Sequence, residues 1–312
     1  MRLVFMGTPD FAVESLKILV ENKYDVVGVI TMPDKPSGRG HKLQVSPVKQ
    51  YALDHKLRLL QPERLKDEAF LEELKSLRAD LQIVVAFRML PEVVWNTPRF
   101  GTFNLHASLL PQYRGAAPIN WSIINGEKET GATTFFLTHE IDTGKVILQE
   151  KINISENDNA GTVHDRLMVL GSILVKKTVD LLAEGKTEAI DQAQFIQPKM
   201  ILRAAPKIFK ETCQIDFSKS VEEVYNFVRG LSPYPSAWAE VEFPGQSKKT
   251  ALKIFETEKE FDKHTLTSGT IVTDTKKFAK IALKDGFINL KSVQVAGKKR
   301  MEIGELLRGI RF

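Results

Sequence analysis

The sequence predicts an α/β protein in which an open, mostly parallel sheet is followed by a small antiparallel β-barrel. Over residues 1–185, short apolar runs alternate with longer segments of helical periodicity, the pattern of parallel strands joined by crossover helices. Beyond residue 211, short β-type runs follow one another with turn residues between them, which is typical of small barrels. The 312 residues also exceed the usual size of a single core, so the length favours two domains.

The strands of the first part are indicated by short runs rich in Val, Ile and Phe that are bounded by Gly or polar residues. We expect strands at 2–7, 25–31, 80–87, 101–108, 131–138 and 144–152. Apolar residues at roughly helical spacing follow Thr8 and Asp10, and they indicate a helix over 8–22. We expect further helices at 67–77, 117–126 and 159–185.

The second part begins after a segment without clear periodicity. Residues 186–211 contain two prolines, and we interpret them as a segment that passes over the surface. A helix is then expected at 220–231, with β runs at 237–243, 250–257, 269–274, 278–290 and 292–295. The predicted division is a first domain at 1–188, a linker at 189–206 and a second domain at 207–312.

Composition argues against several classes of protein. Hydrophobic residues make up 43% and charged residues 27%, which is ordinary for a folded chain and argues against wholesale disorder. The apolar runs are too short to span a membrane, so we expect no membrane partner. Cys213 is the single cysteine, which excludes an internal disulfide framework and favours a reducing, cytoplasmic location.

Sequence motifs of several common chemistries are missing. The loop GTPDFA lacks the G-x-G-x-x-G spacing, and there is no phosphate-loop motif and no G-x-S-x-G turn. His139, Glu140 and Asp142 could be considered as metal ligands, but neighbouring side chains on a strand alternate between faces. We therefore interpret this stretch as surface charge and expect no metal.

The net charge of +5 is unevenly distributed along the chain. Residues 201–312 hold 20 Lys and Arg against 14 Asp and Glu, a surplus of +6, whereas residues 1–200 hold 24 against 25. A solvated lysine-rich surface explains such a surplus, and so does a surface that faces a polyanion such as nucleic acid. Charge alone leaves both interpretations open.

Three polar residues near predicted strand ends form the strongest candidate site. Asn104 and His106 are two residues apart on an apolar strand, so their side chains emerge on one face, and Asp142 follows the strand at 131–138. At the strand ends of one sheet these groups can converge on a single crevice. Such a set suits acyl transfer to an amine: the amide and imidazole donate to the developing oxyanion, and the carboxylate fixes the imidazole tautomer and helps to remove a proton.

The flanks of these residues make a resemblance specific. The segment NLHASLLPQYRGAAPINWSIINGEKETGATTFFL, followed by IDTG, resembles the formyltetrahydrofolate-dependent formyltransferases. The stretches YRGAAPI, PDKPSGRGHKLQVSPVK and RGLSPYPSAWA are similar to the branch that acts on initiator methionyl-tRNA. The resemblance extends over essentially the whole chain.

The resemblance implies a Rossmann-like catalytic domain, an OB-like barrel and formyl transfer from 10-formyltetrahydrofolate to the α-amine of methionyl-tRNA. It implies that Asn104, His106 and Asp142 are catalytic, that no metal takes part and that the chain is a monomer. The folate pocket is then lined by Ser108, Leu109, Leu110 and Pro111 together with Phe87, Arg88, Met89 and Leu90. Contacts to the tRNA fall on Arg39, Lys42, Arg114, Lys207, Lys298 and Lys299.

Two departures from the family pattern affect the pocket rather than the three catalytic residues. Relatives usually carry Tyr-Gly where this chain has Phe87-Arg88, and often Gly-Pro where it has Gly144-Lys145. The Arg88 side chain either contacts the glutamate tail of the folate or points to solvent. Two alternative functions also stay open: formylation of a ribonucleotide amine or amino sugar, and RNA binding without catalysis.

Overall fold

The structure, a computed structural model, describes residues 1–37, 42–246 and 248–310. The chain forms two compact units, each assembled from three separate segments. The first unit comprises Met1–Gly115, Thr130–Ile152 and His164–Ala204. The second comprises Ala116–Glu129, Asn153–Val163 and Ala205–Phe312.

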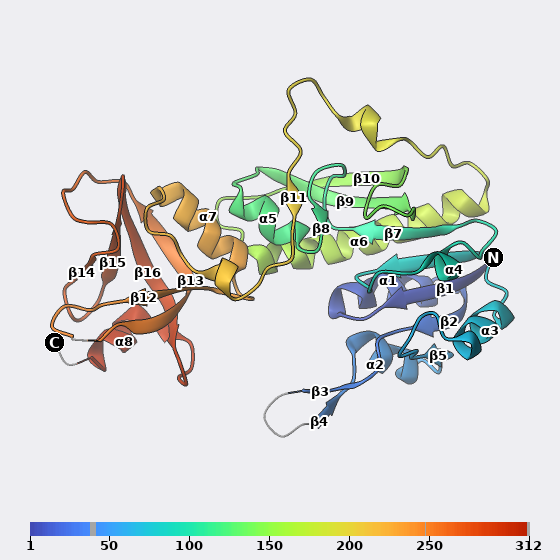
Figure 1. The fold of residues 1–312 in the computed structure, drawn as a ribbon, viewed down its shortest axis with the longest axis horizontal. Helices are drawn as coiled ribbons and strands as arrows, with labels where there is room; N and C mark the ends of the chain where they lie inside the picture. The colour runs from blue at the N-terminus through green and yellow to red at the C-terminus, as the bar shows by residue number, and fades with distance from the viewer. Residues whose placement is uncertain (38–41, 247, 311–312) are drawn as a thin grey trace. The chain divides into compact units, whose positions relative to one another are not determined.

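A seven-stranded sheet forms the centre of the first unit (Figure 1). Its strands, in spatial order, are β10 (Val146–Asn153), β9 (Glu129–Phe136), β7 (Thr102–His106), β6 (Leu81–Val85), β1 (Arg2–Gly7), β2 (Asp25–Ile30) and β5 (Leu59–Leu60). The pairings β5/β2, β2/β1, β1/β6 and β6/β7 are parallel, and β9 runs antiparallel to β7. The prediction of a mostly parallel α/β sheet is confirmed.

The parallel strands are continuous apolar runs because both faces of the sheet are covered. All five residues of β6 are buried, as are five of the six residues of β1. One core cluster packs Val4, Met6 and Val84 against Phe70 and Leu74 of a flanking helix. The carboxyl ends of β6 and β7 lie side by side, with Val85 opposite Leu105.

The helices that lie wholly or mostly in the first unit are, in order, α1 (Asp10–Glu21), α2 (Pro47–Asp54), α3 (Glu68–Ser76), α4 (Glu92–Trp95) and α6 (Ala160–Ala183). The Asp67 carboxylate caps α3 by accepting the N–H of Phe70 at 3.3 Å. The Ser46 hydroxyl caps α2 in the same way, accepting the N–H of Lys49 at 3.1 Å. The sequence pattern does not indicate α2, because its eight residues bury only Val48 and Ala52, too few to show a helical period.

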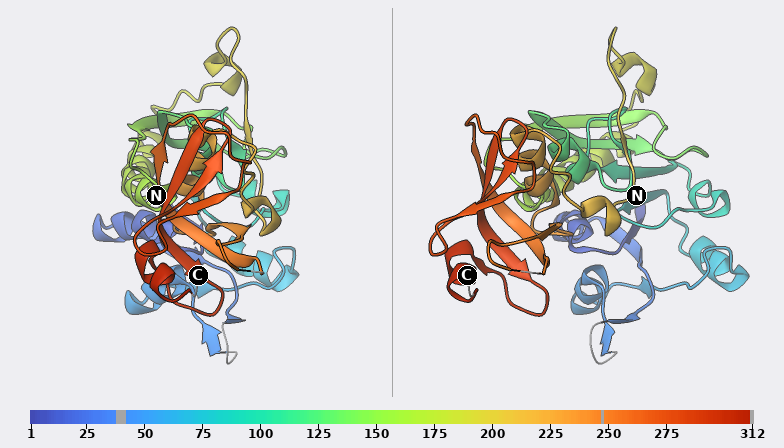
Figure 2. Two further views of the ribbon diagram at one scale, coloured as in Figure 1. Left: turned by 90° about the vertical axis from the view of Figure 1, so that its left-hand side faces the viewer. Right: turned by 60° about the vertical axis from the view of Figure 1, so that its left-hand side comes forward.

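The second unit contains the helices α5 (Pro118–Ile124) and α7 (Val221–Leu231), an antiparallel sheet and a short helix at the end of the chain (Figure 1). The sheet strands are β12 (Ala237–Val241), β13 (Thr250–Glu260), β16 (Gly286–Val295), β15 (Ala279–Leu283) and β14 (Ile271–Thr273), with β17 (Met301–Glu302) paired to β16. Figure 2 shows from two further sides that the long strands bend strongly, as in a partly open barrel. The last helix is α8 (Ile303–Arg308).

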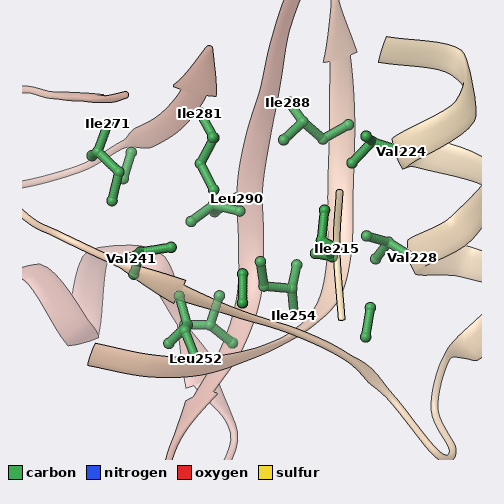
Figure 3. Packing of buried hydrophobic residues seen from close by; sticks show 14 of the residues in the cluster. Ile215, Val224, Val228, Val241, Leu252, Ile254, Ile271, Ile281, Ile288 and Leu290 are labelled. Carbon is green, nitrogen blue, oxygen red and sulfur yellow. The ribbon is translucent and has the colours of Figure 1, made fainter. Parts of the chain in front are cut away.

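The core of the second unit lies between α7 and the sheet. Val224 and Val228 of α7 point toward Ile288 and Ile215 (Figure 3). A capping box starts α7, because the Ser220 hydroxyl accepts the N–H of Glu223 and the Glu223 carboxylate accepts the N–H of Ser220. The predicted antiparallel barrel is therefore confirmed.

One expected β run is divided in the structure. The sequence suggested a run over 278–290 and a separate one over 292–295, whereas β15 ends at Leu283 and β16 continues to Val295. The chain reverses at Lys284-Asp285, and Gly286 follows with φ +156°. A Cβ on Gly286 would lie 2.2 Å from the carbonyl oxygen of Glu260, so this close approach requires glycine.

The irregular segment after α6 forms hydrogen bonds with the first unit at several points. It contains the 3₁₀ turn η1 (Gln192–Phe195), and Ile190 forms an antiparallel bridge with Val146. Figures 1 and 2 show it as the yellow arm that leaves the sheet and returns. Gln112 donates to the carbonyl of Ile201 at 2.9 Å, and Tyr113 donates its N–H to the carbonyl of Arg203 at 2.7 Å.

The remaining short elements are β3 (Lys35–Ser37) paired with β4 (Lys42–Gln44), β8 (Arg114–Gly115), β11 (Ala204–Ala205) and η2 (Glu211–Cys213). Among the helices that the structure describes, none has the length and apolar character needed to cross a membrane.

Candidate active site

Two of the three predicted catalytic side chains lie on one face of β7. Asn104 and His106 are two residues apart in this strand, so both point to the same side of the sheet. Asn104 is opposite Val84 of β6 and Phe135 of β9. The His106 ring meets the Phe135 ring edge-on, with the ring centroids 6.4 Å apart.

The imidazole of His106 is only 6% exposed, and a backbone carbonyl fixes its tautomer. Nε2 lies 2.8 Å from the carbonyl oxygen of Tyr113, and since a carbonyl only accepts, Nε2 carries the proton in this bond. In the neutral ring Nδ1 therefore keeps its lone pair. The tautomer was predicted to be fixed by Asp142, but the carbonyl of Tyr113 takes that role.

Asp142 faces the other imidazole nitrogen. Its Oδ2 lies 3.8 Å from His106 Nδ1, too far for a direct hydrogen bond but close enough for charge attraction. The same oxygen accepts the N–H of Gly115 at 2.9 Å, which holds the carboxylate in place. An imidazole that takes a proton at Nδ1 would be stabilised by this carboxylate.

Asp142 also has an unusual backbone conformation. Its φ of +55° lies in the left-handed region, which residues other than glycine rarely adopt and which is common at functional sites. Two residues later, a Cβ on Gly144 would lie 1.7 Å from the carbonyl oxygen of Phe136. The turn thus lies in close contact with the end of β9, and a larger residue in place of Gly144 would displace the turn.

The side-chain amide of Asn104 is available to a ligand. The residue is half-buried, and within the described ranges its amide forms no hydrogen bond with another side chain or with the backbone. A polar group held on a rigid strand without a protein partner is suited to donate to a substrate oxygen.

The segment predicted to line the folate pocket is mostly buried and is hydrogen-bonded to the strand beside it. Ser108 and Leu110 are fully buried, and the Ser108 hydroxyl donates to the carbonyl of Gln112 at 2.6 Å. The Thr133 hydroxyl donates to the Ser108 carbonyl at 2.6 Å and accepts the N–H of Leu110 at 3.2 Å. Leu109 is half-buried, and Pro111 is buried.

The second predicted pocket segment follows β6 as an irregular loop. Met89 is 73% exposed, Leu90 is buried, and Phe87 packs against the first unit's core. The Arg88 guanidinium donates to the carbonyl of Glu63 at 2.9 Å and to that of Pro62, and its buried Nε has no hydrogen-bond partner within the described residues. Burial lowers the pKa of Arg88 from its usual value.

The predicted RNA contacts lie in different settings. Arg39 lies outside the described residues, and Lys42 begins β4. Lys207, Lys298 and Lys299 are exposed in the second unit, and Lys207 Nζ lies 5.3 Å from the centre of the Phe209 ring. Arg114 is half-buried, and its guanidinium donates to the side chain of Gln192.

Two residues that shape this site, Tyr113 and Gln192, are not indicated by the sequence pattern. Gln192 is 2% exposed and donates to the carbonyl oxygens of Asp142 and Gly144, which lie 50 and 48 positions away in the sequence. No local pattern reveals such a long-range contact. Tyr113 lies two residues after the Leu-Leu-Pro motif, and its φ of +60° has no local signature in the sequence.

Comparison with known families identifies the class of protein. The family model described as "Formyl transferase" matches residues 1–179, and "Formyl transferase, C-terminal domain" matches residues 207–311. The chain belongs to the formyl transferase family. The resemblance predicted from the Asn-x-His segment is therefore confirmed.

Close relatives cover the chain from end to end. A protein of Bacteroides fragilis named "Methionyl-tRNA formyltransferase" is 64% identical over 99% of this chain and 95% of its own length. One of the same name from Flavobacterium johnsoniae is 53% identical over 100% of this chain and 97% of its own. This chain is similar to both across its two parts.

Solved structures share the fold at low sequence identity. The N-formyltransferase from Helicobacter canadensis, in complex with folinic acid and dTDP-3-aminofucose, superposes with a TM-score of 0.64 at 22% identity, covering 92% of this chain and 97% of that one. HypX from Aquifex aeolicus, in complex with tetrahydrofolic acid, gives 0.62 at 17% identity, covering 98% and 47%. These likenesses show the fold.

Proposed function

We propose that this formyltransferase transfers the formyl group of 10-formyltetrahydrofolate to the α-amine of methionyl-tRNA, producing the formylated initiator. The observation that carries the proposal is the unpartnered Asn104 amide beside the His106–Asp142 pair, on a chain whose full-length relatives bear that activity in their names. Family membership supports the class of reaction.

The reaction begins when the neutral amine attacks the formyl carbon. Asn104 donates a hydrogen bond to the formyl oxygen as negative charge develops there. His106 accepts the amine proton at Nδ1, because Nε2 already donates to the Tyr113 carbonyl. Asp142, 3.8 Å from Nδ1, stabilises the imidazolium that forms.

The second half of the reaction returns the proton. The bond between the formyl carbon and the folate nitrogen breaks, and the imidazolium of His106 protonates that nitrogen as tetrahydrofolate departs. The new carbon–nitrogen bond leaves the methionyl amine formylated. No side-chain nucleophile is required, because the attacking nitrogen belongs to the substrate.

The folate site is proposed to lie at the two segments 87–90 and 108–111. Their placement after β6 and β7 supports this, because the carboxyl ends of these parallel strands lie together. The buried side chains of Ser108 and Leu110 and the hydrogen bonds of their backbone to Thr133 support a rigid wall for this proposed site. Exposed Met89 offers an apolar surface at the rim.

The RNA is proposed to be held by Arg39, Lys42 and Arg114 near the aminoacyl end and by Lys207, Lys298 and Lys299 along the stem. The +6 surplus of residues 201–312 and the exposure of the last three lysines support this assignment. We also propose the division into a catalytic part at 1–188, a linker at 189–206 and an RNA-binding part at 207–312. The two family matches, 1–179 and 207–311, are compatible with it, whereas the compact units also place residues 116–129 and 153–163 in the second unit.

The test is a formyl-transfer assay with three acceptors: charged initiator tRNA, free methionine and a nucleotide-linked amino sugar. We expect rapid transfer to the methionyl-tRNA and none above background to the others. Preferred transfer to the amino sugar would replace the proposal with the small-molecule alternative. Folate binding without transfer to any acceptor would contradict a catalytic role.

A further inference from the structure

Gln192 connects the Asp142 turn to the chain that follows the Asn-x-His motif. It is 2% exposed and its amide forms four hydrogen bonds within the first unit. Nε2 donates to the carbonyl oxygens of Asp142 at 2.9 Å and Gly144 at 2.8 Å. Oε1 accepts from Nε and Nη2 of Arg114, at 3.1 and 2.6 Å.

The orientation of this amide follows from the chemistry of its partners. A guanidinium has only donors, and a backbone carbonyl has only acceptors. A flipped amide would place its NH₂ group against Arg114 and its oxygen against two carbonyls, losing all four bonds. Arg114 therefore fixes the direction in which Gln192 points its two N–H groups.

The turn held in this way is the one that aims the Asp142 carboxylate. The Asp142 backbone is in the left-handed region, and the two carbonyls bound by Gln192 lie at Asp142 itself and two residues beyond it. The carboxylate end is held separately by the N–H of Gly115, which directly follows Arg114. Arg114 thus holds the backbone of Asp142 through Gln192, and Gly115 holds the Asp142 side chain.

We propose that Gln192 is a positioning residue for catalysis, setting the place of the Asp142 carboxylate opposite Nδ1 of His106. This inference rests on the proposed formyl transfer. The carboxylate and the imidazole are separated by 3.8 Å without a direct hydrogen bond, so their spacing depends on the surrounding turn. Displacements of about 1 Å at such groups can reduce rates by about 10²-fold.

The first experiment compares Gln192→Met with Gln194→Met in the full chain. Methionine keeps the length of the side chain and removes all four hydrogen bonds, while Gln194 is an exposed glutamine on the same 3₁₀ turn. We expect Gln192→Met to lower kcat by about 10- to 100-fold with the KM for folate within about twofold. Gln194→Met should match the wild type.

The second variant, Gln192→Glu, keeps an acceptor for Arg114 but offers no N–H to the two carbonyls. A positioning role predicts a kcat loss as large as that of Gln192→Met. Wild-type kcat in either variant would overturn the proposal. If both variants failed to fold, Gln192 would be a residue of general stability and the proposal would likewise be wrong.

A double-mutant comparison separates positioning from general stability. If Gln192 acts through Asp142, then adding Gln192→Met to Asp142→Asn should lower kcat by less than about threefold further, because coupled residues are not additive. If kcat of the double variant fell by the full product of the two single losses, the proposal would be wrong. A wild-type chain that formylates no methionyl-tRNA would instead refute the proposed function, so the two failures are distinguishable.

Discussion

At the scale of single residues, the site depends on which atoms are already engaged. The Nε2 proton of His106 is committed to Tyr113, so only Nδ1 can exchange a proton with a substrate. Asp142 faces that nitrogen, and the side-chain amide of Asn104 forms no hydrogen bond in the described part of the chain. The three residues therefore divide into a donor, a base and a charge that stabilises the protonated base.

We predict that Asp142→Asn lowers kcat by at least about 10²-fold while the protein stays folded. The amide can still accept the N–H of Gly115, so the turn is kept, but the negative charge opposite Nδ1 is lost. Steady-state kinetics with methionyl-tRNA and circular dichroism are the measurements. Glu140→Gln removes an exposed charge two residues away and should have no effect. Normal turnover in Asp142→Asn would remove this carboxylate from the mechanism.

The sequence could predict Asn104 and His106 because period-2 spacing on a strand is a local property. It could place Asp142 only approximately, after a strand. Arg88 shows the limit: its two carbonyl partners lie 25 and 26 positions away, and the sequence left its direction open. Side chains whose role is defined by distant backbone groups cannot be assigned from local pattern.

At the scale of elements, periodicity found those segments that bury a full face. The helices α3 and α6 and the fully buried strand β6 lie within three residues of their predicted bounds. Short elements such as α2 and α4 were missed because they bury too few residues to show a period. The antiparallel direction of β9 also has no local signature, since it is decided by pairing with β7.

The Arg88 contacts connect two loops at the carboxyl edge of the sheet, and we predict that Arg88→Met loosens them. Charged hydrogen bonds to carbonyls contribute roughly 1.5–3 kcal/mol each, so the free energy of unfolding should fall by a few kcal/mol at most. The KM for folate should rise several-fold with kcat nearly unchanged. Denaturant unfolding and kinetics measure both. An unchanged folate KM would separate this loop from the folate site.

The turn between β14 and β15 provides a pH-dependent prediction. Oδ1 of Asp274 accepts the N–H groups of Lys276, Lys277 and Phe278 at 3.0, 2.7 and 3.0 Å, which lowers the pKa of Asp274 from 3.8 to about 2. A lowered pKa stabilises the fold above about pH 3.8, and that contribution is lost as the pH falls toward 2. The Tm difference between wild type and Asp274→Asn should therefore shrink from pH 6 to pH 3. A constant difference would contradict this assignment.

At the scale of the whole molecule, the uneven charge predicts how RNA binding responds to salt. Lys298 and Lys299 are exposed in the part that carries the +6 surplus, so each should act as a diffuse phosphate contact. Changing both to Gln should reduce the slope of log K against log salt by about two contacts. Changing Lys66 and Lys75, two exposed lysines of the first unit, is the matched control and should leave the slope unaltered. An equal effect of both pairs would remove the special role of the second part.

For Arg39 we expect an effect on kcat/KM rather than on the salt dependence of binding, because its proposed role requires the shape of its side chain as well as its charge. It stands between two glycines in the sequence, and its planar guanidinium can stack on a base or bind two acceptors together, which an ammonium cannot do. Arg39→Lys should therefore keep the salt dependence of tRNA binding yet lower kcat/KM for methionyl-tRNA by about tenfold, roughly the value of one lost bidentate contact. The Lys298 and Lys299 double change should do the opposite, weakening binding with little effect on kcat. If Arg39→Lys retained full kcat/KM, this residue would contribute charge alone, and placement of the acceptor end would have to be assigned to other residues.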